Sequence, residues 1–365
     1  MGLIKKRPDD QPGSTNEDIL REQAGYVQEV EKAIAEPTDN EIVSLLNRRV
    51  EVKQVISTGS TLLDLSICGE VIRGGGIPGG LLVEIYGRAG LGKTAILSEI
   101  CASAQSNGGK VRFTDPEARL NKEYTRIYGV DLSKKFEYYR PDTVKELFND
   151  YLTPWETNTD SINVFASDSI AALSTEMEME EEDKRGQQRA KDFSQGLRKN
   201  ARSIVDKNIL MIFTNQVRAG ERGDITPGGM GIPFYASIRL AVKQPMLDHF
   251  VKKSKNIGGS KREETIGIKS EITVVKNSVG ISYRKCPIYI MNNYGVDDLR
   301  ANLQYYKEMM GQKSYDVIDR TYISIIDAIH YIEDHNLEEK LRERTIDTWE
   351  MIFREFQEVR KPKKR

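Results

Sequence analysis

Apolar and polar positions show two different spacings in the middle of the chain. Between residues 51 and 292, short apolar runs that suit buried strands alternate with stretches that have helical spacing. The expected strands are 82–86, 110–114, 163–167, 209–214, 238–242, 272–275 and 288–290. Strands that alternate with helices are typical of a mainly parallel sheet covered by helices. We therefore predict an α/β fold for this region.

The two ends of the chain have other patterns. Residues 1–15 are polar and contain prolines and clustered charge, which predicts a loose arm. Helices are expected from Asn16 to just before Pro37 and at 41–46, where apolar residues return at helical spacing. The pattern after residue 292 is again helical and rich in charge. Three parts are predicted: 1–50, an arm with helices for oligomerisation; 51–292, the α/β core; and 293–365, a small α-rich domain with a basic tail.

Composition narrows the class of protein. A chain of 365 residues with 38% hydrophobic content can form one full α/β domain with smaller appendages. Its apolar runs are far shorter than a membrane helix, and none follows the amino-terminal lysines, so neither a membrane span nor a secretory signal is expected. Cys68, Cys101 and Cys286 have no paired spacing, which favours a reducing compartment, the cytoplasm. The net charge of −1 means that nucleic acid would have to bind at local patches.

A phosphate-binding motif follows the strand expected at 82–86. Residues 87–94 have the sequence GRAGLGKT, which fits G-x-x-x-x-G-K-[ST], where glycines let backbone N–H groups turn toward a phosphate. A helix expected at 95–104 follows, and its amino-terminal end favours the anion. We predict that Lys93 reaches the β- and γ-phosphates of ATP and that the Thr94 hydroxyl binds Mg²⁺. The ATP-binding residues predicted in this loop are Gly87, Arg88, Ala89, Gly90, Leu91, Gly92, Lys93 and Thr94.

Further carboxylates are expected beside this loop. Asp168 directly follows the apolar run 163–167, where an aspartate is either a helix cap or a group linked to the metal. Next to a phosphate loop the second role is favoured, through a bridging water. Hydrolysis also needs a group that positions or deprotonates water. Asp115 and Glu117 both follow the strand at 110–114, and their spacing alone does not choose between them.

Beyond the loop, a series of separated segments resembles the bacterial RecA recombinase family, in the correct order. The segments are 56–64, 79–86, 113–124, SDSIAAL at 167–173, FSQGLRK at 193–199, IFTNQVR at 212–218, 228–240 and VVKN at 274–277. Together they cover residues 55–290 and are far more specific than a phosphate loop alone. The resemblance implies a RecA-type P-loop NTPase core that uses ATP and Mg²⁺. The longer amino-terminal arm and the basic tail differ from bacterial members and would suit a phage-encoded relative.

The resemblance implies roles that the spacing of residues leaves open. Glu117, and not Asp115, would be the catalytic carboxylate that activates water. Lys93 and Gln216 would complete the catalytic set. Tyr124 would stack on the adenine, and Gln216 would sense the γ-phosphate at the start of a mobile loop that touches DNA.

By the same resemblance, two loops would face DNA along the axis of a helical filament, near 178–186 and 217–229. Their predicted DNA-binding residues are Lys184, Arg185, Gly186, Arg218, Arg222, Gly228 and Gly229. The first loop is acidic before its basic end, and the second is shorter than in bacterial RecA. Lys276 would reach in trans to the ATP of a neighbouring subunit, and Ser278 stands where the family has a second lysine.

The implied function is a DNA-dependent ATPase recombinase. It would form helical filaments on single-stranded DNA and promote homologous pairing and strand exchange with duplex DNA in recombination and repair. Two other hypotheses are a ring-forming RecA-like motor of the helicase type and a RecA paralogue that regulates filaments. Residues 1–50 are too short for the amino-terminal domain expected of a ring helicase, and the intact ATPase residues disfavour a non-catalytic paralogue. The expected partners are DNA and further copies of this chain, with no membrane.

Overall fold

The computed structural model describes residues 52–120, 122–133, 136–175, 185–220, 223–225 and 231–358. Its helices are α3 (Thr61–Cys68), α4 (Lys93–Ser106), α5 (Lys122–Ile127), α6 (Val144–Glu146), η1 (Leu147–Leu152, a π-helix), η2 (Ile170–Ala172, a 3₁₀-helix), α7 (Arg185–Asp206), α8 (Gly231–Tyr235), α9 (Asp298–Met309), α10 (Ile325–Asp334) and α11 (Glu338–Glu355). Its strands are β1 (Val55–Ile56), β2 (Ile77–Pro78), β3 (Leu82–Gly87), β4 (Val111–Thr114), β5 (Phe136–Tyr139), β6 (Asn163–Ser167), β7 (Ile209–Gln216), β8 (Arg218–Gly220), β9 (Gly223–Ile225), β10 (Ile238–Lys243), β11 (Phe250–Ile257), β12 (Ser260–Asn277), β13 (Lys285–Met291), β14 (Gly295–Val296), β15 (Tyr315–Asp316) and β16 (Thr321–Tyr322). The arm and helices predicted for 1–50 and the basic tail at 361–365 lie outside the described residues. None of the helices in the described ranges combines the length and the apolar character needed to span a membrane.

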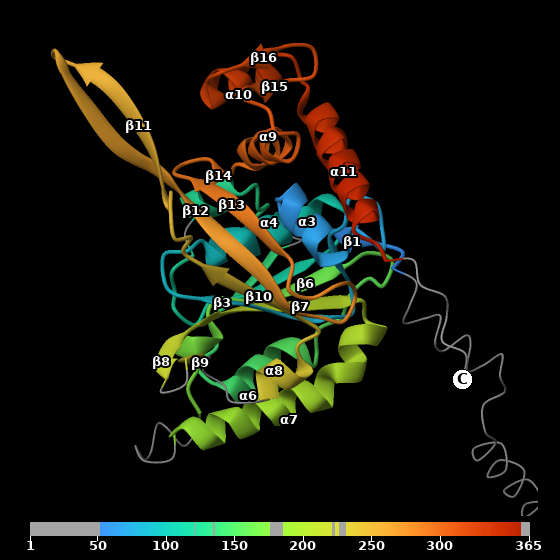
Figure 1. Cartoon of the computed structure of the whole chain (residues 1–365). Helices are drawn as coiled ribbons and strands as arrows, with labels where there is room; N and C mark the ends of the chain where they lie inside the picture. Colours follow the sequence, from blue (N-terminus) through green and yellow to red (C-terminus); the bar gives the residue numbers. More distant parts are fainter. Residues whose placement is uncertain are drawn as a thin grey trace, which may run out of the picture. The chain divides into compact units, whose positions relative to one another are not determined.

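A ten-stranded sheet lies at the centre of the described part (Figure 1). The strand order is β14-β13-β12-β10-β3-β7-β6-β4-β5, and β11 pairs with β12 outside this path. The strands from β10 to β5 in this order pair in parallel, whereas β11 to β14 form an antiparallel extension. Each of the seven predicted strands overlaps an observed one. The predicted α/β fold with a mainly parallel sheet is therefore confirmed.

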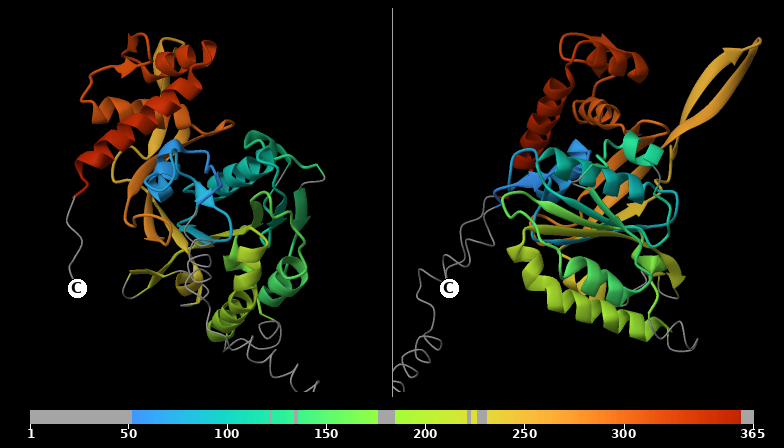
Figure 2. Two further views of the ribbon diagram at one scale, coloured as in Figure 1. Left: turned by 90° about the vertical axis from the view of Figure 1, so that its right-hand side faces the viewer. Right: turned by 180° about the vertical axis from the view of Figure 1, so that it is seen from behind.

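Helices cover both faces of the sheet (Figure 2). Helices α3 and α4 lie on one face, and α6, α7 and α8 lie on the other. Strand β7 shows the division, because Leu210 and Ile212 belong to the core shared with α4, whereas Met211 and Phe213 belong to the core shared with α7. Since neither face is exposed, the central strands are apolar at nearly every position. This explains why the sequence shows continuous apolar runs there and not strict alternation.

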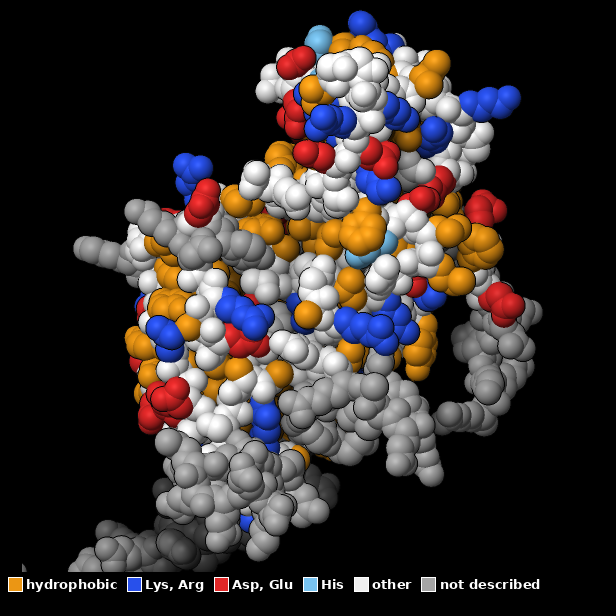
Figure 3. Space-filling view, turned by 90° about the vertical axis from the view of Figure 1, so that its left-hand side faces the viewer, with side chains coloured by type: hydrophobic (Ala, Val, Ile, Leu, Met, Phe, Trp, Pro, Cys, Tyr) orange, Lys and Arg blue, Asp and Glu red, His pale blue; other side chains and the backbone are white. Residues whose placement is uncertain are grey.

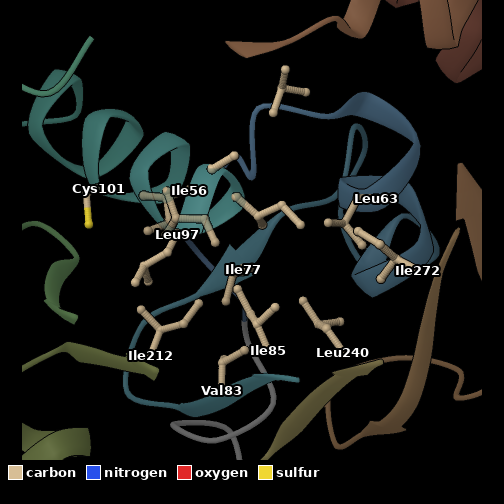
Figure 4. Packing of buried hydrophobic residues seen from close by; sticks show 14 of the residues in the cluster. Ile56, Leu63, Ile77, Val83, Ile85, Leu97, Cys101, Ile212, Leu240 and Ile272 are labelled. Atoms are coloured by element: carbon tan, nitrogen blue, oxygen red, sulfur yellow. The ribbon is translucent and has the colours of Figure 1, made fainter. Parts of the chain in front are cut away.

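The larger core lies between the sheet and helices α3 and α4 (Figure 4). Leu63 of α3 and Leu97 and Cys101 of α4 are packed in one cluster with Ile85 and Ile212 of the sheet, and all five are fully buried. Complete burial of one such aliphatic side chain stabilises a fold by about 1.5–3 kcal/mol. This core holds β3 and α4 in place on either side of the turn that joins them.

A smaller core lies in the carboxy-terminal elements. It includes Leu299 and Leu303 of α9, Ile332 of α10 and Leu341 of α11, with Val317 between them. The helical pattern expected after residue 292 is present as these three helices. The boundary of a separate domain at this point stays a prediction.

Two arginines connect α11 to the segment that follows α3. Arg73 forms ion pairs of 2.7 to 2.9 Å with three carboxylates of α11. These are Glu343, Asp347 and Glu350. The Arg284 guanidinium pairs with Glu70 and lies 5.0 Å from the ring centroids of Trp349 and Phe353. Charge and ring faces thus contribute to the attachment of this helix.

Asp64 of α3 is a buried carboxyl that should make stability depend on pH. It accepts hydrogen bonds from the Ser57 hydroxyl (2.5 Å) and from the amide and hydroxyl of Thr58 (2.8 and 2.7 Å). Burial nevertheless raises its pKa from 3.8 to about 7, and the charge of Asp298 acts in the same direction. Between these two pKa values the folded chain binds more protons than the unfolded chain. Asp64 therefore lowers the free energy of unfolding as the pH rises through this window, and its effect levels off above about pH 7.

Replacing Asp64 by asparagine should remove this titration. The slope of unfolding free energy against pH should become less negative by about 1.4 kcal/mol per pH unit between about pH 5 and pH 7. Urea unfolding at a series of pH values measures the slope. Asp160→Asn, which changes an exposed carboxylate, is the control and should leave the slope unchanged. An equal slope in Asp64→Asn and the unaltered chain would contradict the prediction.

Candidate active site

Four parallel strands bring the predicted site residues to one edge of the sheet. The register of β3 and β7 aligns Gly87 with Gln216, and that of β4 and β6 aligns Thr114 with Ser167. The carboxyl ends of β3, β4, β6 and β7 therefore lie together. In open α/β sheets this edge is where ligands bind. The phosphate loop follows β3, and the predicted carboxylates follow β4 and β6.

The phosphate loop turns sharply before it enters α4. Gly90 and Gly92 have φ angles of 77° and 88°, in the left-handed region that favours glycine. A Cβ atom at Gly92 would lie 1.9 Å from Cδ1 of Ile290, so a side chain there would clash as well as strain the backbone. Gly92 is also the cap residue of α4 and offers the helix no side-chain cap. The first N–H groups of α4 are thus not capped by residue 92, which suits an anion at this helix end.

Lys93 folds back over the loop. Its Nζ donates hydrogen bonds to the carbonyl oxygens of Gly87 (3.0 Å) and Arg88 (2.8 Å). Burial lowers the pKa of Lys93, whereas the negative charges of Asp168 and Glu117 act to raise it. The ammonium group therefore lies on the glycine-rich turn with two carboxylates nearby. This arrangement suits the phosphates of a nucleotide.

Asp168, directly after β6, links this strand to β7 and to the start of α4. It accepts hydrogen bonds from the hydroxyls of Thr214, near the end of β7, and of Thr94, in the first turn of α4. Burial raises the pKa of Asp168, and these two hydrogen bonds oppose the rise. Thr94 and Asp168 are thus in direct contact, as expected for a pair that shares one ion. A hydroxyl and a carboxylate are hard oxygen donors, and Mg²⁺ keeps several waters in such sites, so these residues fit that ion.

The Glu117 carboxylate, which follows β4, contacts residues at the ends of β6 and β7. Its Oε1 accepts hydrogen bonds from the Ser169 hydroxyl (2.7 Å) and from Nε2 of Gln216 (3.3 Å). Its Oε2 forms an ion pair with Arg119 (2.8 Å), and 13% of the side chain is exposed. Glu117 is therefore held in position and can still be reached from outside.

Asp115 has a different environment. It is almost fully buried and accepts hydrogen bonds from the amide of Leu120 (2.8 Å) and the Tyr138 hydroxyl (2.9 Å). These bonds hold the turn that carries Glu117. Of the two carboxylates, Glu117 is thus the more accessible, whereas Asp115 is buried and bound within the turn.

Lys276 does not join the other predicted residues. The register aligns it with Arg239 of β10, and aligns Arg239 with Glu84 in the first half of β3. Its Nζ donates hydrogen bonds to the carbonyl oxygens of Pro233 (2.9 Å) and Phe234 (2.8 Å). Lys276 thus lies toward the edge of the sheet opposite the phosphate loop of its own chain. A contact with ATP would have to be made to a neighbouring copy.

Several predicted residues cannot be compared in the same way. Tyr124 lies in α5, Arg185 and Gly186 begin α7, and Arg218 begins β8, but the burial and contacts of these four residues are outside the described part. Four others lie outside the described residues altogether: Lys184, Arg222, Gly228 and Gly229. The predicted loops near 178–186 and 217–229 follow β6 and β7, which are neighbours in the sheet.

Sequence reasoning missed three hydroxyl contacts of this site. Ser169 and Thr214 bind Glu117 and Asp168, and Ser270 of β12 donates to the carbonyl oxygen of Leu91 in the phosphate loop (3.0 Å). Ser169 directly follows Asp168, which was the available signal. Ser270 has no comparable signal, because it meets the loop only through the register of the sheet.

Known proteins resemble this chain over most of its length. The model of the RecA N-terminal domain matches residues 24–297. Protein RecA of Allorhizobium ampelinum is 33% identical over 258 residues, and that of Rhizobium rhizogenes is 34% identical over 258 residues. Both matches cover 68% of this chain and 66% of the relative, so the chain spans just under two thirds of their length. Protein RecA of Xanthomonas axonopodis pv. citri is 31% identical over 265 residues, covering 70% of this chain and 71% of the relative.

Proposed function

Because this chain belongs to the RecA family, we propose that it is a Mg²⁺-dependent, DNA-dependent ATPase that forms helical filaments on single-stranded DNA. In recombination and repair it would promote homologous pairing and strand exchange with duplex DNA. The observation that carries this proposal is the Glu117 carboxylate, which is hydrogen-bonded to Gln216 at the start of the predicted DNA loop. The three cysteines are buried and free, which supports a reducing compartment such as the cytoplasm.

The residues at the sheet edge divide the work of hydrolysis. The loop from Gly87 and the first turn of α4 would bind the phosphates of ATP, with Lys93 exchanging its carbonyl partners for phosphate oxygens. Thr94 and, through water, Asp168 would hold Mg²⁺, which would neutralise negative charge on the phosphates. Glu117 would take the proton of the attacking water as a general base.

Gln216 offers a route from nucleotide to DNA. Its side chain binds Glu117 in this structure, and the chain continues directly into β8 and the predicted DNA loop. We propose that a γ-phosphate competes with Glu117 for the Gln216 amide, so that binding and hydrolysis order and release the loop. The proposed DNA contacts are the seven residues Lys184, Arg185, Gly186, Arg218, Arg222, Gly228 and Gly229.

The filament proposal uses Lys276 in trans. Its position away from the phosphate loop of its own chain supports a contact with a neighbour. The Lys276 ammonium would then leave the carbonyl oxygens of Pro233 and Phe234, which it binds in the isolated chain. Burial lowers the pKa of Lys276, and the charge of Arg239 adds to that effect, so a phosphate partner would also stabilise its charged form.

Electron microscopy of the full chain tests the proposal. With single-stranded DNA and a non-hydrolysable ATP analogue, we expect stretched helical filaments. Closed rings would favour a helicase-type motor. The absence of both filaments and rings would favour a paralogue that regulates filaments.

Substituting Arg218 and Arg222 together by alanine should weaken single-strand binding and lower its salt dependence by about two phosphate contacts. Unchanged affinity and salt dependence would contradict the role of the second loop.

A further inference from the structure

Strands β11 and β12 form a hairpin that projects from the sheet (Figure 1). Every residue from Lys252 to Thr265 is exposed, although the strands stay paired to the last pair, Ile257 with Ser260. An isolated two-stranded hairpin is at best marginally stable in water, because it has no apolar face to bury. The projecting part therefore adds nothing to the cores of the described chain. Its geometry suits contact with another molecule.

The projecting part of the hairpin is a local basic patch in a chain of net charge −1. Residues 252–264 have the sequence KKSKNIGGSKREE, in which five cations accompany two carboxylates. Figure 3 views the molecule from the side toward which the hairpin projects in Figure 1, and Lys and Arg side chains lie in the upper part of this face, intermixed with carboxylates. A patch of this kind can bind a polyanion even when the whole chain has no excess of positive charge.

Two cations face each other across the hairpin. The register places Lys255 directly opposite Arg262, so their side chains share one face, and Lys253 lies on the same face two residues away. Like charges in directly opposite positions destabilise a strand pair. On the other face, Glu263 pairs with Lys252 (3.0 Å). Within the described ranges no ion pair relieves Lys255 and Arg262, so an anion bound between them would stabilise the hairpin.

The composition of the hairpin favours duplex DNA over a single strand. The major groove, about 12 Å wide, admits a two-stranded ribbon, and its rims are lines of phosphates. Proteins that hold single strands use aromatic side chains on which the bases stack. Residues 252–265 contain no aromatic residue, so they offer phosphate contacts without a stacking surface.

The strand that carries this hairpin also touches the phosphate loop. Strand β12 extends from Ser260 to Asn277 with a register shift at Ile266, and its buried Ser270 donates a hydrogen bond to the carbonyl oxygen of Leu91 (3.0 Å). Ile268 of the same strand lies 4.0 Å from the position that a Cβ atom of Gly92 would take. A molecule that binds the hairpin therefore contacts a strand that also contacts the proposed ATP site.

We propose that the projecting part of the hairpin, residues 252–265, is a duplex-binding finger. Lys253, Lys255 and Arg262 bind the phosphate backbone of double-stranded DNA, independently of its sequence. This inference rests on the proposed function, since it takes DNA to be the partner. It assigns the incoming duplex a contact surface separate from the two loops proposed for the single strand.

The test compares variants of the exposed hairpin in the full chain. Lys255→Ser combined with Arg262→Ser should weaken binding to a duplex oligonucleotide, and the slope of log affinity against log salt should fall by about 2. Glu264→Gln, which removes the carboxylate directly opposite Lys253 on the same face, should strengthen binding. The exchange Lys252→Glu with Glu263→Lys keeps the net charge and the ion pair, and should leave affinity unchanged. Fluorescence anisotropy over a series of KCl concentrations measures all three.

The outcomes separate this inference from the proposed function. Unchanged duplex affinity and salt slope in the serine variant would overturn the finger, and an equal loss of affinity for a single strand of the same length would overturn its assignment to duplex DNA. A change in self-association without DNA, at unchanged duplex affinity, would make the hairpin a contact between copies and also overturn it. If the unaltered chain showed no ATP hydrolysis stimulated by single-stranded DNA, the proposed function would fail, while selective loss of duplex binding in the serine variant would still support the finger.

Discussion

Replacing Glu117 by glutamine should slow ATP hydrolysis by at least about 100-fold and leave ATP binding intact. The amide keeps an oxygen that accepts the hydrogen bond of Ser169, so the local geometry should survive. It cannot take a proton from water, however. General-base catalysis contributes about 10²- to 10⁴-fold, and kcat in the presence of single-stranded DNA should fall by that factor. Steady-state phosphate release measures kcat, and titration with a fluorescent ATP analogue measures affinity.

The control for this substitution is Asp115→Asn. Asp115 accepts hydrogen bonds from Leu120 and Tyr138 and makes none of the contacts of Glu117. Its amide should lower stability, because the turn loses part of a buried hydrogen-bond network, while hydrolysis by the folded fraction persists. The assignment of Glu117 would be wrong if Glu117→Gln kept normal hydrolysis, or if Asp115→Asn alone abolished it at full stability.

Replacing Arg239 by methionine should destabilise the chain strongly. Glu84 of β3 has no exposed surface, and its two oxygens are bound by Nε of Arg239 (2.6 Å) and Nδ2 of Asn215 (2.9 Å). The Arg239 guanidinium also lies 4.6 Å from the ring centroid of Tyr86. Removing one partner of a buried ion pair leaves a charge without compensation, which costs about 3–5 kcal/mol. Chemical unfolding at neutral pH measures the loss.

A second substitution distinguishes the effect of an unpaired buried charge from the effect of lost packing. In the double variant with Glu84→Leu and Arg239→Met no carboxylate remains buried at position 84, so it should recover much of the stability lost in Arg239→Met. The explanation would be wrong if the double variant were as unstable as the single one. It would also be wrong if Arg239→Met lost less than about 1 kcal/mol, the range of an exposed ion pair.

The central architecture could be predicted because its sequence pattern is local. The run at 209–214 is apolar at almost every position, since β7 is covered on both faces, and such runs separated by helical stretches leave few topologies. The phosphate loop could be predicted for the same reason, because strand, glycines and helix follow one another directly. The local pattern did not distinguish Glu117 from Asp115, because both follow the same strand. The contacts that support Glu117 join residues 52 and 99 positions away in the chain.

The antiparallel extension was harder to predict. Only 272–275 and 288–290 show apolar strand patterns there, because β11 and the first part of β12 are polar on both faces. Without a buried face there is no alternation to detect, and pairing between the strands depends on register alone. The position of Lys276 has the same origin. Its direction follows from the antiparallel course of β12, which the pattern of residues 274–277 does not reveal.

The attachment of α11 responds to its surroundings differently from the cores. Arg73 is about half exposed, so its attraction to the α11 carboxylates is screened by dissolved ions, whose Debye length is about 8 Å at physiological ionic strength. Apolar packing does not weaken in this way, and sulfate or phosphate salts strengthen it. Added salt should therefore weaken the ion pairs between Arg73 and α11, while apolar packing in the cores keeps its strength. The ionic strength of the solution therefore sets how strongly the Arg73 ion pairs contribute to the attachment of the last helix.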